Sequence, residues 1–344
     1  MSILYVVSNQ EGAGKTAVCA ALARMLSLRD KSPTTLKPLA AGADAASDTD
    51  PGIYEKLLGQ RQPEGWPLDL AGSELQSGSV EQIAQVVARE SEGTDVTLVE
   101  ASSGLSAEDS RRLAEAMNAQ VLLVLRHKRD QNVEGLKRWR DAFGDRLVGS
   151  IVNGMSRYAG TETRDSSLPA MESEGLRPLG VVPEDRRLLS VSVGHLAQHL
   201  GGRFIVGPDR ADALVEHYMV GGLGMDPGEL TFELRDNKAV IVRGDRPDVQ
   251  MSALLTPTTC MVLTNGSEPI EYVKYEAEQE EVAVMVVETD TLTTMDALGP
   301  VMAGARFDHP LKLARFAELL EEHVNLEPLW DALGVDRTGS EEPF

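Results

Sequence analysis

Short apolar runs alternate with segments of helical spacing along the first part of the chain. The run ILYVV at residues 3–7 is continuously apolar, which is typical of a strand buried on both faces, and AVCAALARML at 17–26 follows it with helical spacing. Further strands are predicted at 34–40, 95–101, 120–126, 147–155 and 179–185, and further helices at 80–90, 107–117, 133–143 and 191–202. This alternation predicts an α/β fold, with a doubly wound parallel sheet covered by helices.

The pattern restarts after GGRFIVGPDR at residues 201–210. Glycine and proline are concentrated there, and more apolar strands follow before a closing helix predicted from 311 to about 332. We therefore predict a first domain at 1–205, a second, smaller α/β domain at 206–332, and a frayed polar tail at 333–344.

Length and charge limit the classes of function. A chain of 344 residues can build two domains, and its net charge of -21 counts against nucleic acid or an anionic membrane as a partner. Its two cysteines match no metal or disulfide pattern, and His195 and His199 are expected to be solvated or packed rather than metal ligands. With no run of eighteen apolar residues, the protein is expected to be cytoplasmic.

The stretch SNQEGAGKT at residues 8–16 lies directly after the first strand and opens a helix. Such a loop directs backbone N–H groups at phosphate, its lysine reaches the outer phosphates, and its threonine hydroxyl binds magnesium. Asn9 stands where the usual motif has glycine, and asparagine tolerates positive φ. The predicted phosphate-binding residues are Gly12, Ala13, Gly14, Lys15, Thr16 and Ala17.

Magnesium prefers oxygen ligands, which carboxylates near such a loop can supply. Glu100 ends the apolar strand VTLV, at the sheet edge where doubly wound folds bind ligands. Asp48 and Asp50 form a pair in the loop SDTDPG. We predict Thr16, Asp50 and Glu100 as metal ligands, with Asp48 as a weaker candidate.

The order of SNQEGAGKT, LKPLAAG, SDTDPGIYEKLLG, TLVEASSG, GSIVNGM and GVVPEDRRL resembles the dethiobiotin synthetase branch of P-loop proteins. The resemblance covers nearly all of residues 1–205 and implies a magnesium-ATP site. It implies that Lys15 and Lys37 are catalytic residues and that Lys37 helps to neutralise a carbamate and the transferred phosphoryl group, whereas from the residue alone a lysine snorkelling beside a strand end stays open. It also implies adenine contacts from Asn153, Pro183 and Glu184.

Two departures from the family pattern fall on the side of the organic substrate. Ala41 replaces a serine of the family in KPLAAG, and EASSG, with Ser102, replaces a glycine-rich turn. The resemblance to the family therefore supports the nucleotide-binding half of the site more strongly than the substrate-binding half.

The second domain carries the turns GDR at 244–246 and LTNG at 263–266, and it resembles the DRTGG domain. Asn265 replaces a glycine there, and asparagine suits a left-handed position. Asp245 and Arg246 could pair with each other or bind an anion. The glycine-rich MVGGLGMDPGEL at 219–230 has no Lys-Ser/Thr and argues little for phosphate. The tandem order of the two domains is similar to the N-terminal portion of long bacterial phosphate acetyltransferases. The acetyl-transferring domain of those enzymes has no counterpart in this sequence, so we expect no acetyl transfer.

Three functions are compatible with these residues. The first is a regulatory protein that binds Mg²⁺ and ATP, hydrolyses ATP slowly if at all, and offers a protein partner a surface on its DRTGG-like domain. The second is an ATP-dependent enzyme that activates a carboxylate or carbamate. The third is a structural module with a vestigial P-loop. The resemblance also implies a homodimer.

Overall fold

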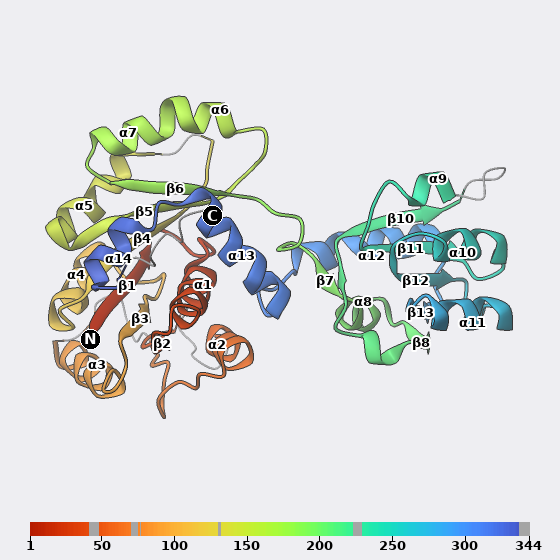
Figure 1. Cartoon of the computed structure of the whole chain (residues 1–344), viewed down its shortest axis with the longest axis horizontal. Helices are drawn as coiled ribbons and strands as arrows, with labels where there is room; N and C mark the ends of the chain where they lie inside the picture. Colours follow the sequence, from red (N-terminus) through yellow and green to blue (C-terminus); the bar gives the residue numbers. More distant parts are fainter. Residues whose placement is uncertain (41–47, 70–74, 76, 130–131, 223–228, 337–344) are drawn as a thin grey trace, which may run out of the picture. The chain divides into compact units, whose positions relative to one another are not determined.

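The computed structural model of the chain describes residues 1–40, 48–69, 75, 77–129, 132–222 and 229–336. These residues form two compact units (Figure 1). The first unit combines Met1–Glu184 with the described residues from Phe307 onward, and the second unit is Asp185–Arg306. The second unit is therefore inserted between two parts of the first.

In the first unit, six described strands form one parallel sheet in the order β2-β3-β1-β4-β5-β6. Strand β1 lies between β3 and β4, so the chain winds outward from it in both directions. Ligands of doubly wound sheets bind at the carboxyl ends of the strands at such a point. The strands are β1 (Ser2–Ser8), β2 (Pro33–Leu36), β3 (Val96–Glu100), β4 (Gln120–Arg126), β5 (Leu147–Met155) and β6 (Pro178–Pro183).

Helices cover both faces of this sheet, as the alternation of the sequence predicts. Apolar side chains of α3, α4, α5 and α7 form one buried cluster with the strands. In Figure 1, α3, α4 and α5 lie on one side of the sheet, and α1 and α13, which contact each other, on the other. The helices between the strands are α1 (Lys15–Ser27), α2 (Asp50–Leu58), α3 (Ser77–Glu90), α4 (Ala107–Ala116), α5 (Lys137–Phe143), α6 (Gly160–Glu162) and α7 (Leu168–Ser173).

The C-terminal helices α13 (Pro310–His323) and α14 (Glu327–Leu333) complete the first unit. Helix α13 buries Leu313, Phe316 and Leu320 and contacts α1 and β6. The chain after it pairs with the edge strand β6, because Gly180 has no side chain to keep out the backbone oxygen of His323, which lies 2.2 Å from a Cβ built there.

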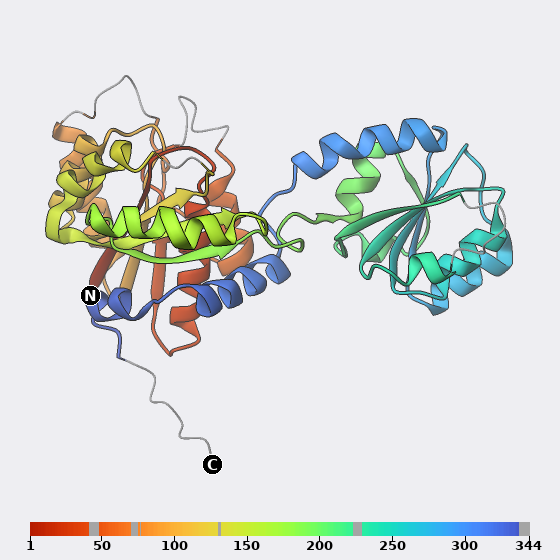
Figure 2. The same ribbon diagram turned by 90° about the horizontal axis from the view of Figure 1, so that it is seen from above.

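The second unit contains a smaller sheet in the order β10-β11-β12-β13-β8, parallel except for β8. Figure 2 shows this sheet between two helical layers, in which α8 and α12 pack on one face and α9, α10 and α11 on the other. Its strands are β7 (Val191–Ser192), β8 (Arg203–Val206), β9 (Leu214–Val215), β10 (His217–Gly221), β11 (Lys238–Arg243), β12 (Thr258–Thr264) and β13 (Ala283–Val286). Its helices are α8 (Val193–Leu200), α9 (Glu229–Phe232), α10 (Pro247–Leu254), α11 (Glu271–Gln279) and α12 (Thr291–Ala303).

The sequence-based boundary near residue 205 is wrong. It falls inside the second unit, because the apolar face of α8 is buried against β11, β12 and β13. Gly201 is the left-handed C-cap of α8, with φ 63°, rather than a linker residue. The paired glycines therefore end a helix, and the chain enters the second unit at Asp185.

The prediction that the closing helix belongs to the second domain is also wrong. This segment is two helices, α13 and α14, and both belong to the first unit. The predicted tail at 333–344 is wrong in its first residues, since Leu333 and Val335 are buried; residues 337–344 lie outside the described part of the chain.

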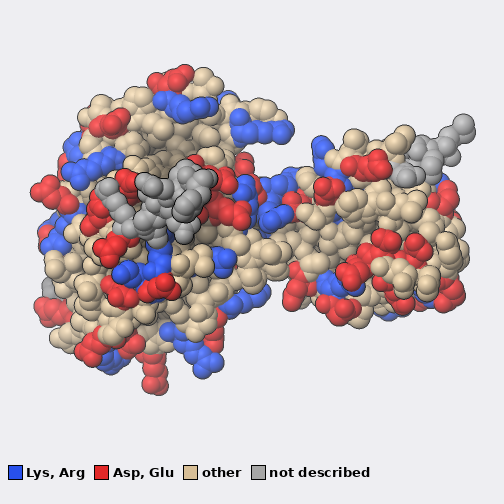
Figure 3. Space-filling model, in the orientation of Figure 1, with Lys and Arg blue, Asp and Glu red and all other residues tan. Residues whose placement is uncertain are grey.

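The acidic excess lies on the surface. On the face shown in Figure 3, acidic and basic side chains are interspersed over the first unit, and acidic ones predominate over the second. A surface of this kind repels polyanions unless cations are locally clustered. Among the described helices, none is long and apolar enough to cross a membrane.

Candidate functional site: the P-loop and its carboxylates

The loop between β1 and α1 has the backbone of a phosphate cradle. Gly12 and Gly14 both have positive φ, 68° and 96°. A Cβ at Gly14 would lie 2.3 Å from the side-chain nitrogen of Asn153, so both the backbone and the close packing require glycine. Helix α1 begins at Lys15 with no acidic residue in its first turn, which leaves its N-terminal N–H groups and dipole suited to an anion.

Asn9 does not have the conformation proposed from the sequence. Among the described non-glycine residues with positive φ, Asn9 is absent, so tolerance of left-handed backbone does not explain it. Its side-chain oxygen is instead buried without a hydrogen-bond partner. The loop closes with an ordinary backbone at this position, and the glycine of the usual motif is not needed there.

Lys15 is held at the mouth of the loop. Its Nζ donates hydrogen bonds to the hydroxyls of Ser8, at 2.9 Å, and Ser103, at 2.6 Å. Burial lowers the pKa of Lys15, and the neighbouring Glu100 carboxylate opposes that shift. The P-loop lysine is therefore fixed between the end of β1 and the loop after β3, and no motif in the sequence points to Ser103.

Thr16 and Glu100 are brought together as the metal prediction requires. The register of the sheet places Glu100 of β3 beside Val6 of β1, two residues before that strand ends at Ser8. The Thr16 hydroxyl donates to Glu100 Oε1 at 2.9 Å. Tyr54 of α2, which the sequence analysis did not single out, donates its hydroxyl to Glu100 Oε2 at 2.5 Å. Burial raises the pKa of Glu100 and raises that of Tyr54 well above its ordinary value.

Lys37 is completely buried among three carboxylates. Its Nζ lies 2.9 Å from Asp48 Oδ2 and 3.6 Å from Glu100 Oε1, and it pairs with Asp50 as well. Burial lowers the pKa of Lys37, but Glu100 and Asp50 outweigh it and hold that pKa above its usual range. The alternative of a snorkelling lysine is wrong, because the ammonium end reaches no solvent.

The donors around Lys37 suit a hard cation. Mg²⁺ is usually held by one or two carboxylates together with phosphate and water, and the Thr16 hydroxyl with the Glu100 and Asp50 carboxylates provides such a set. The Lys37 ammonium already binds at two of these carboxylates as a cation would. Within the described residues, no three His, Cys, Asp or Glu side chains converge in metal-binding geometry by themselves. Phosphate oxygens would have to complete the coordination.

The residues proposed for adenine lie at neighbouring strand ends. Asn153, near the end of β5, donates from Nδ2 to the carbonyl oxygen of Ala13 at 2.9 Å and so contacts the phosphate loop directly. Pro183 ends β6, and Glu184 follows it, with its carboxylate 3.3 Å from Arg126. The structure therefore brings Asn153 to the loop and sets Pro183 and Glu184 at the adjacent edge.

The substrate side is described only in part. Ser102 donates its hydroxyl to the carbonyl oxygen of Ala40 at 2.5 Å, which ties the loop after β3 to the chain after β2. Ala41 lies outside the described residues. In the departure EASSG, the Ser102 hydroxyl thus holds the chain after β2, and the Ser103 hydroxyl accepts a hydrogen bond from Lys15.

The turns of the second unit pack against one another. Asn265 has φ 66°, which confirms the left-handed position predicted for it. A Cβ at Gly244 would lie 2.2 Å from the backbone oxygen of Ser267, so the GDR and LTNG turns touch at a glycine. Asp245 pairs with Arg243 at 2.5 Å, and Arg246 with Asp248 at 2.8 Å, so the predicted pairing of Asp245 with Arg246 is wrong in its partners.

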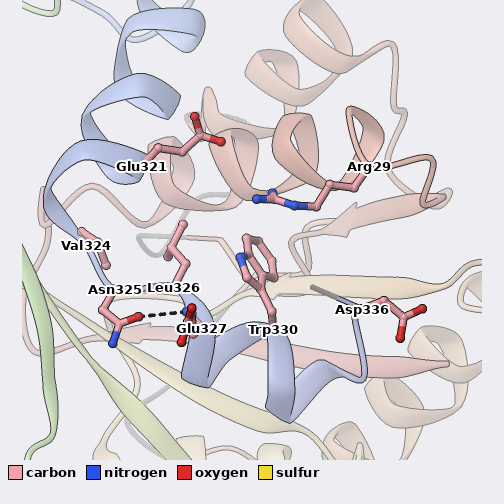
Figure 4. A pocket seen from close by; sticks show the side chains of 8 residues that line it. All are labelled: Arg29, Glu321, Val324, Asn325, Leu326, Glu327, Trp330 and Asp336. Atoms are coloured by element: carbon pink, nitrogen blue, oxygen red, sulfur yellow. Dashed lines mark hydrogen bonds between the residues drawn. The ribbon is translucent and has the colours of Figure 1, made fainter. Parts of the chain in front are cut away.

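A separate cavity of about 410 Å³ lies between the turn after α1 and the helices α13 and α14. Figure 4 shows the Arg29 guanidinium beside the Trp330 ring, 5.0 Å from its centroid. The other charged side chains around it are Glu321, Glu327 and Asp336. Because its one arginine is stacked and its other charges are negative, this cavity does not suit a triphosphate, and the P-loop stays the candidate site.

Two protein families match the chain. The AAA domain matches residues 2–191, and the DRTGG domain matches residues 195–300. The ATP-dependent dethiobiotin synthetase BioD of Rhodococcus erythropolis is 34% identical over 142 residues, covering 36% of this chain and 62% of that enzyme. The chain therefore spans less than two-thirds of that relative.

Similar solved structures include two of lower identity. Cobyrinic acid a,c-diamide synthase from Mycobacterium smegmatis, with bound ADP and magnesium, is 17% identical, covers 54% of this chain and 88% of that one, and has a TM-score of 0.40. The CBS and DRTGG domains of Clostridium perfringens pyrophosphatase, complexed with the activator diadenosine tetraphosphate, are 13% identical over 42% of this chain and 71% of that one, at a TM-score of 0.29.

At such TM-scores the likeness carries no argument about ligands, and the fold rests on the strand order itself. The family match does establish membership, because it covers more than half of the chain and includes the P-loop. The protein thus belongs to the AAA domain family of P-loop proteins, resembles its dethiobiotin synthetase branch, and carries a DRTGG domain after the P-loop domain.

Proposed function

We propose that the first unit binds Mg²⁺ and ATP, and that the protein is a nucleotide-dependent regulator. The observation that carries this proposal is the joining of Lys15 to the loop mouth and of Thr16 to Glu100 at one end of the sheet. A vestigial P-loop has no need of a buried lysine and a buried carboxylate at these positions, because burying charges without a purpose costs stability.

Each residue has a defined task in this proposal. The backbone of residues 12–17 holds the phosphates, and Lys15 binds the outer ones. Thr16, Asp50 and Glu100 hold the metal, and Asn153, Pro183 and Glu184 contact the base. Magnesium, when bound, neutralises phosphate charge.

The regulatory part of the proposal concerns the second unit. Its glycine-marked turns are closed against each other, and Asp245 and Asp248 each pair with an arginine, as expected of a folded scaffold that presents a surface. We propose that this unit serves a protein partner of the phosphate acetyltransferase type, and that the protein works as a homodimer.

The second candidate is an ATP-dependent enzyme that activates a carboxylate or carbamate. One observation favours it: Lys37 is buried beside the metal carboxylates, where a positive charge would stabilise a transferred phosphoryl group. An enzyme of this kind would release ADP only in the presence of its amine or carboxylate substrate.

Calorimetric titration with ATP, with and without Mg²⁺, tests the binding proposal. We expect binding by the wild-type protein that Mg²⁺ strengthens and that Lys15→Ala removes. Lys56→Ala, an exposed position on α2, is the matched control. No binding by the wild type, or equal binding by Lys15→Ala, would refute the proposal. A screen for ADP release with diaminopelargonate and related metabolites separates the enzyme, and stimulation lost in Lys37→Ala would establish it.

A further inference from the structure

The ammonium of Lys37 occupies the position of a cation among the expected metal ligands. It lies 3.6 Å from Glu100 Oε1, the same oxygen that accepts the Thr16 hydroxyl at 2.9 Å. It also pairs with Asp50, the other expected metal carboxylate, and with Asp48. Two predicted ligands of the metal are therefore already in contact with a protein cation.

This contact is built into the fold from both sides. The backbone N–H of Lys37 donates to Gln62 Oε1 at 2.7 Å, and Gln62 Nε2 donates back to the Thr35 carbonyl oxygen at 3.0 Å. The start of the side chain is thus fixed beside the end of β2, and only its long flexible end can change position. The carboxylates of Asp48 and Glu100 are as deeply buried as the lysine, with side chains only 3% and 2% exposed.

A metal ion alone cannot neutralise the carboxylates around Lys37 without repelling the Lys37 ammonium. Three carboxylates face the Lys37 ammonium, and the Lys15 ammonium also interacts with those of Glu100 and Asp50, so the cluster keeps an excess of negative charge. A divalent ion on Glu100 and Asp50 would, however, lie within a few ångströms of the ammonium, and like charges that close repel strongly in a buried site. A triphosphate would resolve this conflict, because its oxygens give Lys37 a new anionic partner.

We propose that Lys37 is the resident counter-cation of the metal site in the nucleotide-free protein, so that it competes with Mg²⁺ and makes metal binding depend on nucleotide. This inference rests on the proposed Mg-ATP site and adds a role for Lys37 before any chemistry. By thermodynamic reciprocity, the same competition makes nucleotide binding depend on the metal.

Binding of Mn²⁺ alone, followed by the loss of the free-ion electron paramagnetic resonance signal, tests this role without ATP. We expect Lys37→Met, which keeps the length of the side chain and removes its charge, to bind Mn²⁺ about tenfold more tightly than wild type or better. Lys37→Arg keeps the positive charge and should not gain Mn²⁺ affinity over wild type. Lys56→Met changes an exposed lysine on α2 and should also behave as wild type.

Equal or weaker Mn²⁺ binding by Lys37→Met would overturn the inference. If Lys37→Met does not fold in metal-free buffer, Mn²⁺ alone should restore its folding, because the ion replaces the lost charge beside the carboxylates. Failure of Mn²⁺ to restore folding would overturn the inference as well. In Lys37→Met, the gain in Mn²⁺ affinity on adding ADP should shrink relative to wild type. Failure of the proposed function is visible separately, as absent ATP binding by the wild type.

Discussion

Tyr54 should be a positioning residue for Glu100, and Tyr54→Phe tests this with the removal of one oxygen atom. Both side chains are buried, and the hydroxyl donates to Glu100 Oε2 at 2.5 Å. A hydrogen bond to a charged group contributes about 1.5–3 kcal/mol, and the carboxylate keeps its contacts with Thr16 and Lys37. We therefore expect a loss of about 2 kcal/mol in the free energy of unfolding, or about 4–8 °C in the Tm of the first unit.

The pH dependence of this loss gives a sharper test. Burial raises the pKa of Glu100 above its ordinary 4.5, and the Tyr54 hydroxyl opposes that shift. Above pH 4.5 the folded state then holds more protons than the unfolded state, so stability falls as pH rises towards the folded pKa. Tyr54→Phe raises that pKa further, so its deficit should be larger at neutral pH than at about pH 5.5.

Thermal unfolding followed by circular dichroism at both pH values measures the deficit, with Tyr158→Phe as the control, since Tyr158 is 76% exposed. The weaker hold on Glu100 should also raise the Mg²⁺ concentration needed for ATP binding. A Tyr54→Phe protein as stable as wild type at neutral pH, with unchanged Mg²⁺ dependence, would refute the reasoning.

Three further predictions follow from backbone and burial. Gly14 has φ 96°, and a Cβ there would lie 2.3 Å from the buried Asn153 amide, so Gly14→Ala should abolish ATP binding in calorimetry. A Cβ at Gly12 meets nothing, so Gly12→Ala should lower the free energy of unfolding by only about 1 kcal/mol. Gly244→Ala meets a backbone oxygen at 2.2 Å and should lower the Tm of the second unit much more than Gly222→Ala, whose Cβ meets nothing; equal Tm values would contradict this. Burial lowers the pKa of Lys238 to about 8 from 10.5, so the unfolded state binds more protons between those values and stability should rise with pH there; urea titrations of Lys238→Met should lack that rise.

The strands and the phosphate loop could be predicted from the sequence because their signals are local. The run at residues 3–7 is apolar at every position, and the loop motif is contiguous and lies between a strand and a helix. The meeting of Thr16 with Glu100 followed from one rule, that the carboxyl ends of parallel strands share an edge.

The missed features depend on contacts between distant segments. Ser103 and Tyr54 are ordinary polar residues in sequence, and only the fold carries them to Lys15 and Glu100. Gly201 has the composition of a linker but caps a helix. In the sequence, helix α13 follows the second domain directly and looks like its last element. Only its packing on α1 shows that it belongs to the first unit.

A crystal structure with Mg²⁺ and a non-hydrolysable ATP analogue tests the central claim most directly. We predict the phosphates on the backbone of residues 12–17, the metal on the Thr16 hydroxyl with Asp50 and Glu100, and Lys37 Nζ moved from the carboxylates to the phosphates. An analogue bound elsewhere, or a metal held without Thr16 and Glu100 while Lys37 keeps its present partners, would contradict the claim.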